Sequence, residues 1–321
     1  MKTAPFNAHN APPSGGLCAF LFPGQGSQFA GMGQSLAESF PAAHECFGKA
    51  DDALGFALSK MCFEGPEEDL KKTEFQQPAL LAVSMAAYAV LKEHAGEPHY
   101  VAGHSLGEYS ALVAAGALEF GEALRLVHKR GRYMQEAVPA GVGAMAALLR
   151  LPEGKLDGIL AEAAQGEVVT PAGFNSPDQI VISGNYGAVG RAVELAKAAG
   201  AKRAVLLPVS APFHCPLMKP AQERLLVDLN ATRFYDLRIP LVNNWQAREI
   251  HTGDEARQGL YQQVPNPVRW TETIGYLAAN GVERWFEVGA GGVLSGLVRS
   301  IVAGAKCTPF GEAEDVGKLN A

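Results

Sequence analysis

The stretch Tyr100–Ala115, YVAGHSLGEYSALVAA, contains the motif G-x-S-x-G over residues 103–107. We predict a short strand over Tyr100–Gly103 and a helix over Ser105–Ala117. Only small flanking residues permit the tight, strained turn between such a strand and helix, and the helix would point its N-terminal N–H groups toward the serine oxygen. This pattern indicates a nucleophile at Ser105, and the alternative is a glycine-rich turn in which the serine is incidental.

The segments on both sides of this turn alternate between strand and helix patterns. The apolar run LCAFLF at residues 17–22 predicts a buried strand. Helical patterns occur at residues 33–58, 76–94, 118–136 and 217–229, and a late strand is predicted at residues 282–288. Together these segments indicate an α/β body.

The middle of the chain follows a different order. Its predicted elements are a strand at 144–149, a helix at 152–164, strands at 168–174 and 179–183, a helix at 186–200 and a strand at 204–207. The order βαββαβ is the ferredoxin-like pattern. We therefore predict a ferredoxin-like subdomain at residues 141–207, inserted into a body formed by residues 17–140 and 208–312. Residues 1–16, rich in Pro, Gly and Asn, are expected to be a flexible N-terminal tail, and residues 313–321 a C-terminal tail.

Composition argues against several classes of protein. The chain has 321 residues, of which 48% are hydrophobic, and its formal net charge of −6 argues against a broad basic face for nucleic acid. The longest apolar run, residues 78–91, is shorter than the roughly 20 residues that span a bilayer, so a buried helix is expected there. Five scattered cysteines without a CxxC pair predict neither disulfides nor a zinc site, and the first residues lack the apolar core of a secretory signal. A cytoplasmic location is therefore expected.

A serine nucleophile needs a base, because its hydroxyl reacts poorly at neutral pH. Downstream of Ser105, His128 lies within a helical pattern and His251 lies in a polar turn. His214 lies in the loop after a predicted strand, where catalytic groups of α/β proteins gather. We therefore favour His214 as the base, and the alternative is a packed loop histidine. No downstream aspartate stands out as a third member, so a backbone carbonyl or an amide is expected to orient His214.

A second glycine-rich turn, FPGQGSQ at residues 22–28, also follows a predicted strand. Its glycines would let backbone N–H groups face a bound oxygen, which suits an oxyanion hole. The alternative is an ordinary tight turn.

Seven motifs extend over nearly the whole chain. They are FPGQGSQ (22–28), GHSLGEYSAL (103–112), KRGRYMQ (129–135), FNSP (174–177), APFHCPLMKP (211–220), NPVRW (266–270) and EVGAGGVLSGL (287–297). In this order they resemble the malonyl-CoA:acyl carrier protein transacylase family. The resemblance implies an α/β-hydrolase-like body with a ferredoxin-like insertion.

The resemblance also implies roles for eight residues of the expected site. Ser105 would be the nucleophile, His214 its general base and acid, Gln25 and Leu106 the oxyanion-hole N–H donors, Arg130 the partner of the malonyl carboxylate, Gln263 the residue whose carbonyl orients His214, and Asn175 and Phe213 pocket residues. Phe213, directly before His214, resembles the malonyl-selecting pattern of related acyltransferases.

The implied activity moves a malonyl group from malonyl-CoA to the phosphopantetheine thiol of acyl carrier protein by a ping-pong mechanism. It would supply fatty-acid or polyketide synthesis, act as a monomer, and need no cofactor or metal. One alternative is a serine thioesterase of the same fold, but a hydrolase of neutral acyl chains has no use for a buried Arg130. Another is a non-catalytic interaction protein, which would not need Ser105, His214 and both glycine-rich turns together.

Overall fold

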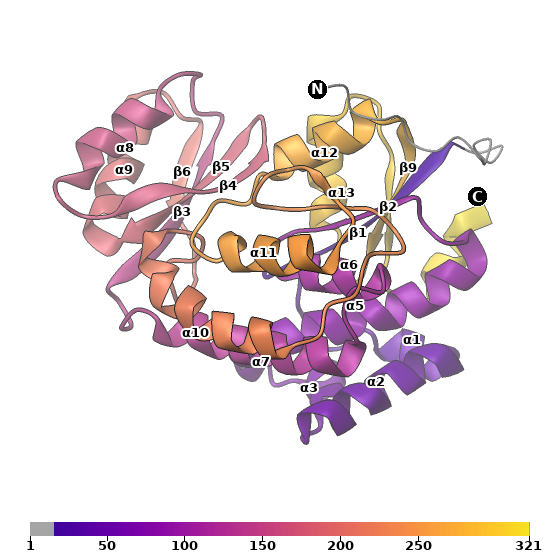
Figure 1. Cartoon of the computed structure of the whole chain (residues 1–321). Helices are drawn as coiled ribbons and strands as arrows, with labels where there is room; N and C mark the ends of the chain where they lie inside the picture. Colours follow the sequence, from indigo (N-terminus) through magenta and orange to yellow (C-terminus); the bar gives the residue numbers. More distant parts are fainter. Residues whose placement is uncertain (1–15, 321) are drawn as a thin grey trace.

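The computed structural model describes residues 16–320, which form two sheets flanked by helices (Figure 1). The tail expected at residues 1–16 lies outside the described residues apart from Gly16. The larger sheet consists of β1 (Leu17–Phe22), β2 (Tyr100–Gly103), β7 (Leu241–Val242), β8 (Glu249–Ile250), β9 (Val282–Val288) and β10 (Cys307–Phe310). Its strand order is β10-β9-β1-β2-β7-β8, and its neighbouring pairs are parallel except β7 and β8. This is the mixed α/β body expected from the sequence.

The smaller sheet is separate and antiparallel, and Figure 1 shows it at the upper left. It consists of β3 (Gly143–Leu149), β4 (Val169–Ser176), β5 (Gln179–Asn185) and β6 (Arg203–Leu206), in the order β4-β5-β3-β6. Helices α8 (Leu156–Ala164) and α9 (Tyr186–Ala198) pack on it through their own apolar cluster. The chain order of these six elements is the one predicted for residues 141–207.

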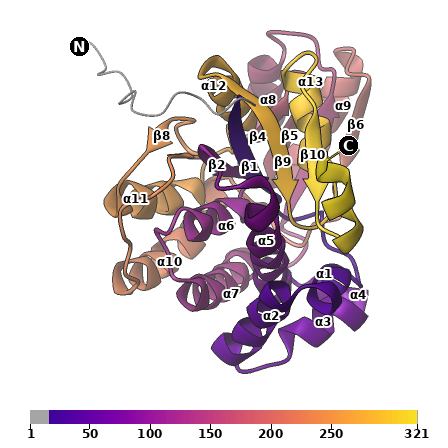
Figure 2. The ribbon, with the colours of Figure 1, turned by 90° about the vertical axis from the view of Figure 1, so that its right-hand side faces the viewer.

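The remaining helices belong to the body that contains the larger sheet, and several of them pack on other helices rather than on its strands. They are α1 (Gln34–Ser39), α2 (Pro41–Leu54), α3 (Leu58–Glu64), α4 (Glu67–Leu70), α5 (Thr73–Ala95), α6 (Gly107–Ala114), α7 (Phe120–Glu136), α10 (Lys219–Ala231), α11 (Gly253–Gln263), α12 (Trp270–Ala279) and α13 (Val293–Ile301), with 3-10 turns η1 (Pro216–Met218) and η2 (Ala313–Asn320). Helix α5 is the buried helix expected around residues 78–91, and Figure 2 shows it between the sheet and helices α2 and α7. Along the described residues, no helix is both long and apolar enough to cross a membrane.

Two differences from the sequence prediction have simple causes. The helix expected at residues 33–58 is broken into α1, α2 and α3, because Pro41 begins a new helix and Gly55, with a φ of 74°, ends it. The tail expected at residues 313–321 instead forms η2 up to Asn320. Apolar side chains of η2, those of Val316 and Leu319, pack against the main core, which holds this segment on the body.

Candidate active site

Two glycine-rich turns, one after β1 and one after β2, pack directly against each other. A Cβ on Gly107 would lie 2.0 Å from the carbonyl oxygen of Phe22, and one on Gly24 would lie 2.4 Å from the carbonyl oxygen of His104. Glycine is therefore required at both positions by the close approach of the two backbones. Ser105 sits at the tip of the second turn with a φ of 52°, a strained value of the kind that functional sites store.

The hydroxyl of Ser105 faces His214, which lies in the loop after β6. Ser105 Oγ and His214 Nε2 are 2.7 Å apart, and both residues are buried. His214 Nδ1 lies 2.9 Å from the backbone carbonyl oxygen of Gln263. Because a carbonyl can only accept, Nδ1 carries the proton and Nε2 is free to accept the proton of Ser105. The orienting group is thus a backbone carbonyl rather than a carboxylate.

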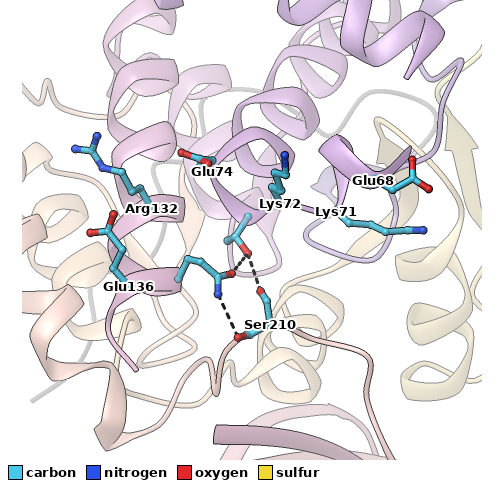
Figure 3. A pocket seen from close by; sticks show the side chains of 9 residues that line it. Glu68, Lys71, Lys72, Glu74, Arg132, Glu136 and Ser210 are labelled. Carbon is cyan, nitrogen blue, oxygen red and sulfur yellow. Dashed lines mark hydrogen bonds between the residues drawn. The ribbon is translucent and has the colours of Figure 1, made fainter. Parts of the chain in front are cut away.

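The loop that carries His214 is tied to the helices beside it. The hydroxyls of Ser210 and Thr73 are 3.2 Å apart, and Gln135 Nε2 donates to the carbonyl oxygen of Ser210 at 3.2 Å (Figure 3). These contacts connect the loop to the start of α5 and the end of α7. Thr73, Gln135 and Ser210 line a cavity of about 390 Å³ together with charged side chains of both signs. Neither Ser105 nor His214 lines this cavity. We therefore assign these contacts a role in holding the loop in place.

Arg130 lies on α7 and is fully buried beside Ser105. Its Nη2 donates to Ser105 Oγ at 3.2 Å and to Gln263 Oε1 at 2.8 Å, and its Nη1 donates to Gln77 Oε1 at 2.8 Å. Helix α7 can approach α5 this closely because residue 131 is glycine, where a Cβ would lie 2.4 Å from the carbonyl oxygen of Thr73. A buried cation whose hydrogen-bond partners are all neutral is suited to bind an anion.

Gln263, the last residue of α11, connects the three residues just described. Its backbone carbonyl contacts His214, and its side-chain oxygen accepts from Arg130. Its side-chain nitrogen donates to the carbonyl oxygen of Ser105 at 3.0 Å and to Glu108 Oε2 at 2.8 Å. The amide can take only this orientation, because the reverse one would place its NH₂ group against the guanidinium and its oxygen against two acceptors.

The other residues expected in the site lie around this group. Leu106 is fully buried directly after Ser105, and Gln25 lies in the turn after β1, where its side-chain amide donates to Gln76. Among the described residues, neither the Gln25 nor the Leu106 amide N–H donates to a backbone carbonyl. Phe213 is buried beside His214.

Asn175 has a partner that the sequence did not indicate. Its Oδ1 lies 2.8 Å from Nε2 of His104, the residue before Ser105, so the β4 strand contacts the turn that carries the serine. His104 also packs edge-on against Trp270. Asn175 therefore lies at the site through His104.

Sequence reasoning missed two buried polar residues, Asn244 and Glu108. Asn244 Oδ1 accepts from the backbone N–H of Ser105 at 2.7 Å, and its Nδ2 donates to the carbonyl oxygen of Gly103 at 2.7 Å. The signal for Asn244 was weak, because the strand before it, β7, has only two residues. Glu108 lies three residues after Ser105, in the first turn of α6, where a helix period places it near the serine.

Burial and charge determine which groups are ionised. Burial, and secondly the neighbouring Arg130, lowers the pKa of His214 to about 3, so the neutral imidazole is present at pH 7. Burial raises the pKa of Glu108 to about 7, against the lowering effect of the hydrogen bond from Gln263. Burial also lowers the pKa of Arg130. The site therefore holds a base ready to accept a proton beside a buried cation.

A buried serine, a histidine base and a cation aligned on one oxygen define an acyl-transfer site on an α/β body. The model of the acyl transferase domain family matches residues 19–316, so the chain belongs to this family. Within this family, the chain is 51% identical over 285 residues to malonyl CoA-acyl carrier protein transacylase of Escherichia coli K12. The matched residues cover 88% of this chain and 92% of that relative. The resemblance inferred from the seven motifs is confirmed.

Solved structures agree with this assignment. A malonyl-transacylase in complex with a type II PKS acyl-carrier protein superposes with a TM-score of 0.92 at 45% identity, covering 95% of this chain and all 100% of that one. The malonyl CoA-acyl carrier protein transacylase of Coxiella burnetii superposes with a TM-score of 0.92 at 43% identity, covering 94% of this chain and 96% of that one. The chain thus has the fold of transacylases over nearly its whole length.

Proposed function

We propose that this chain transfers a malonyl group from malonyl-CoA to the phosphopantetheine thiol of an acyl carrier protein, through an ester on Ser105. One observation carries the proposal. Ser105 Oγ lies within hydrogen-bond distance of both a histidine base, His214, and a fully buried cation, Arg130. A base activates the hydroxyl, and the cation provides a partner for an acyl group that carries its own carboxylate.

In the first half-reaction, the Ser105 hydroxyl attacks the thioester carbonyl of malonyl-CoA while His214 Nε2 takes its proton. The new C–O bond forms, and the carbonyl electrons move to the oxygen to give a tetrahedral oxyanion. When this collapses, the C–S bond breaks and the CoA thiolate leaves, receiving the proton that His214 holds. The products are malonyl-Ser105 and CoA.

The second half-reaction reverses these steps. His214 takes the proton of the carrier's phosphopantetheine thiol, and the sulfur attacks the ester carbonyl. The C–O bond to Ser105 breaks, and the serine oxygen regains the proton from His214. This is a ping-pong mechanism, because CoA leaves before the carrier thiol reacts.

We assign stabilisation of the oxyanion in both half-reactions to the backbone N–H groups of Gln25 and Leu106. The close packing of the two glycine-rich turns supports this assignment, since it brings the Gln25 loop against the Ser105 turn. The lack of a backbone acceptor for either N–H among the described residues also supports it. Each such donor is expected to contribute about 2.7–4 kcal/mol to lowering the barrier.

Three finer features belong to the same proposal. The larger sheet is α/β-hydrolase-like, and the βαββαβ unit with its antiparallel sheet is a ferredoxin-like insertion, as the element and strand orders favour. An acyl carrier protein is the acceptor, as in the complex of the similar malonyl-transacylase. The chain acts as a monomer, and the proton and acyl transfers written above require no metal or cofactor.

The rival function is a serine thioesterase, which would use the same nucleophile and base but pass the acyl group to water. Arg130 argues against it. Its full burial has a desolvation cost that a neutral acyl chain would never offset.

Intact-mass measurement tests the proposal directly. On mixing with malonyl-CoA, the chain should gain the mass of one malonyl group, and adding holo acyl carrier protein should move that mass to the carrier. A thioesterase would instead release free malonate without labelling the carrier. Failure to label either protein would contradict the proposal.

Arg130 should determine the choice of acyl group. Removing one partner of a buried charge pair costs about 2–5 kcal/mol, so Arg130→Ala should lower kcat/KM for malonyl-CoA by roughly 30- to 5,000-fold at about 1.4 kcal/mol per factor of ten. Acetyl transfer should persist or rise, because acetyl has no carboxylate to pair. Lysine at this position should rescue only partly, since it lacks the planar fork.

The measurement is kcat/KM for malonyl-CoA and acetyl-CoA in each variant. Arg132→Ala is the matched control, because Arg132 is exposed on the same helix. An unchanged malonyl-to-acetyl ratio in Arg130→Ala would remove Arg130 from the site and reopen the thioesterase alternative.

A further inference from the structure

Glu108 is a buried carboxylate that the mechanism above does not use. It is fully buried in the first turn of α6, and it forms no salt bridge with any of the described residues. Its Oε2 accepts from Gln263 Nε2 at 2.8 Å and from the backbone N–H of Asn244 at 3.0 Å, while its Oε1 has no hydrogen-bond partner among the described residues. Its two partners are both donors, so this arrangement favours the ionised carboxylate.

Arg130 is the cation of the hydrogen-bond network that contains Glu108, and the side chain of Gln263 connects these two residues. The Gln263 amide accepts from Arg130 through its oxygen and donates to Glu108 through its nitrogen. Arg130 itself has neutral hydrogen-bond partners: the side chains of Gln77, Gln263 and Ser105. When Glu108 is ionised and no substrate is bound, the negative charge that balances Arg130 is therefore held one amide away.

We propose that Glu108, where it is ionised in the free enzyme, and the malonyl carboxylate alternate as the counter-charge of Arg130, and that malonyl binding to this form is accompanied by uptake of one proton from solvent at Glu108. The inference rests on the proposed function, because it requires an acyl group with a carboxylate beside Arg130. When that carboxylate pairs directly with the guanidinium, two negative charges flank one positive charge. Since like charges disfavour ionisation, the carboxylate that is farther from Arg130, Glu108, takes the proton.

Among the ionisable groups that surround it, Glu108 is the one whose pKa lies near neutral pH. Arg130 on α7 faces it, and Tyr109 lies beside it on α6, with a pKa that burial raises to about 12. Helix α11 and the segment after β7 present only amides to it, those of Gln263 and Asn244. His214 has its pKa lowered to about 3, so it stays neutral throughout this range.

The sign of the pH dependence follows from linkage. Free Glu108, with its pKa raised to about 7, is protonated below pH 7 and ionised above it. Below pH 7, malonyl binding needs no proton uptake, so affinity should not depend on pH. Above pH 7 each binding event must capture a proton, so the half-saturating malonyl-CoA concentration should rise by up to about tenfold per pH unit. Acetyl-CoA brings no carboxylate, so its half-saturating concentration should change by less than about twofold.

The experiment measures the rate of acylation of Ser105 by intact mass, from pH 6 to 9, against malonyl-CoA or acetyl-CoA concentration. The key variant is Glu108→Gln, because its amide oxygen can still accept from Gln263 and Asn244 while the charge is gone. Its half-saturating malonyl-CoA concentration should be independent of pH and roughly tenfold below wild type at pH 8. A residue that only supports the fold would not lower this concentration.

Glu287→Gln is the matched control. Glu287 is also a fully buried carboxylate that accepts from two backbone N–H groups, those of Leu294 and Ser295 at the start of α13. This control should keep the wild-type pH dependence.

Two results would overturn the inference. One is a half-saturating malonyl-CoA concentration of the wild-type enzyme that stays constant from pH 6 to 9. This measurement does not depend on whether any variant folds. The other is a Glu108→Gln enzyme that keeps the wild-type rise above pH 7. If malonyl-CoA fails to acylate Ser105 at any pH, the proposed function fails instead.

Discussion

Replacing Ser105 with alanine is expected to abolish the malonyl-enzyme and to lower kcat for malonyl transfer by about 10⁶-fold, the order observed when the nucleophile of a serine hydrolase is removed. The reason is that Ser105 Oγ is the atom on which His214 Nε2 and Arg130 Nη2 both converge, at 2.7 Å and 3.2 Å. Without it, the base has no proton to take and the acyl group has no attachment point. Intact mass after mixing with malonyl-CoA measures the acyl-enzyme.

The fold should tolerate this change, because alanine is smaller than serine and leaves the backbone N–H contact with Asn244 in place. A far-UV spectrum and melting temperature close to wild type are the check. Ser110→Ala is a suitable control, since Ser110 is also buried and lies in the helix that follows. Malonyl labelling of Ser105→Ala at the wild-type level would mean that another residue carries the acyl group.

Replacing His214 with alanine is expected to slow acylation by roughly 10²–10⁴-fold, the range that a positioned general base contributes. His214 holds its proton on Nδ1, toward the Gln263 carbonyl, so Nε2 faces the serine hydroxyl as an acceptor. Because its pKa is lowered to about 3, this acceptor form predominates at every pH above about 4. An activity change near pH 7 should therefore come from a group other than His214.

Two other histidines serve as controls for His214→Ala. His128 Nδ1 contacts the carbonyl oxygen of Glu74 at 2.9 Å and its ring packs beside Phe75, so His128→Ala should affect stability more than rate. His251 is largely exposed and pairs with Glu249, so His251→Ala should have little effect. The rate of acylation in a single turnover distinguishes the three variants. If His128→Ala were the crippled one, the assignment of His214 would be wrong.

Parts of this protein follow from local sequence because local chemistry controls them. A strand, a turn that begins and ends on glycine and a helix predict the geometry at Ser105, since a Cβ on Gly103 would lie 1.9 Å from the carbonyl oxygen of Gly107 within the same turn. The strand expected at residues 282–288 lies between two glycines, Gly281 and Gly289, and the structure has it over the same residues. The βαββαβ order of residues 141–207 is also local, because each element has its own periodicity.

Other parts could not be read from the sequence because distant segments make them. Strands β7 and β8 have two residues each, too few for any periodic pattern, yet they bring Asn244 to the backbone of Ser105 across 139 positions. From position alone, Arg130 resembles a residue on a solvated helix face shared with Lys129 and Arg132. Only the packing of α7 on α5 buries it.

The sequence by itself determined the family, because residue types in short motifs identify it. The same motifs predicted Ser105 as the nucleophile and the loop of His214 as the source of the base. Only the tertiary structure decided which polar groups share one buried network: Gln263 between Arg130, Glu108 and His214. The physical reason is desolvation. A guanidinium or a carboxylate leaves water only where donors and acceptors from several elements meet it, and no single segment supplies them.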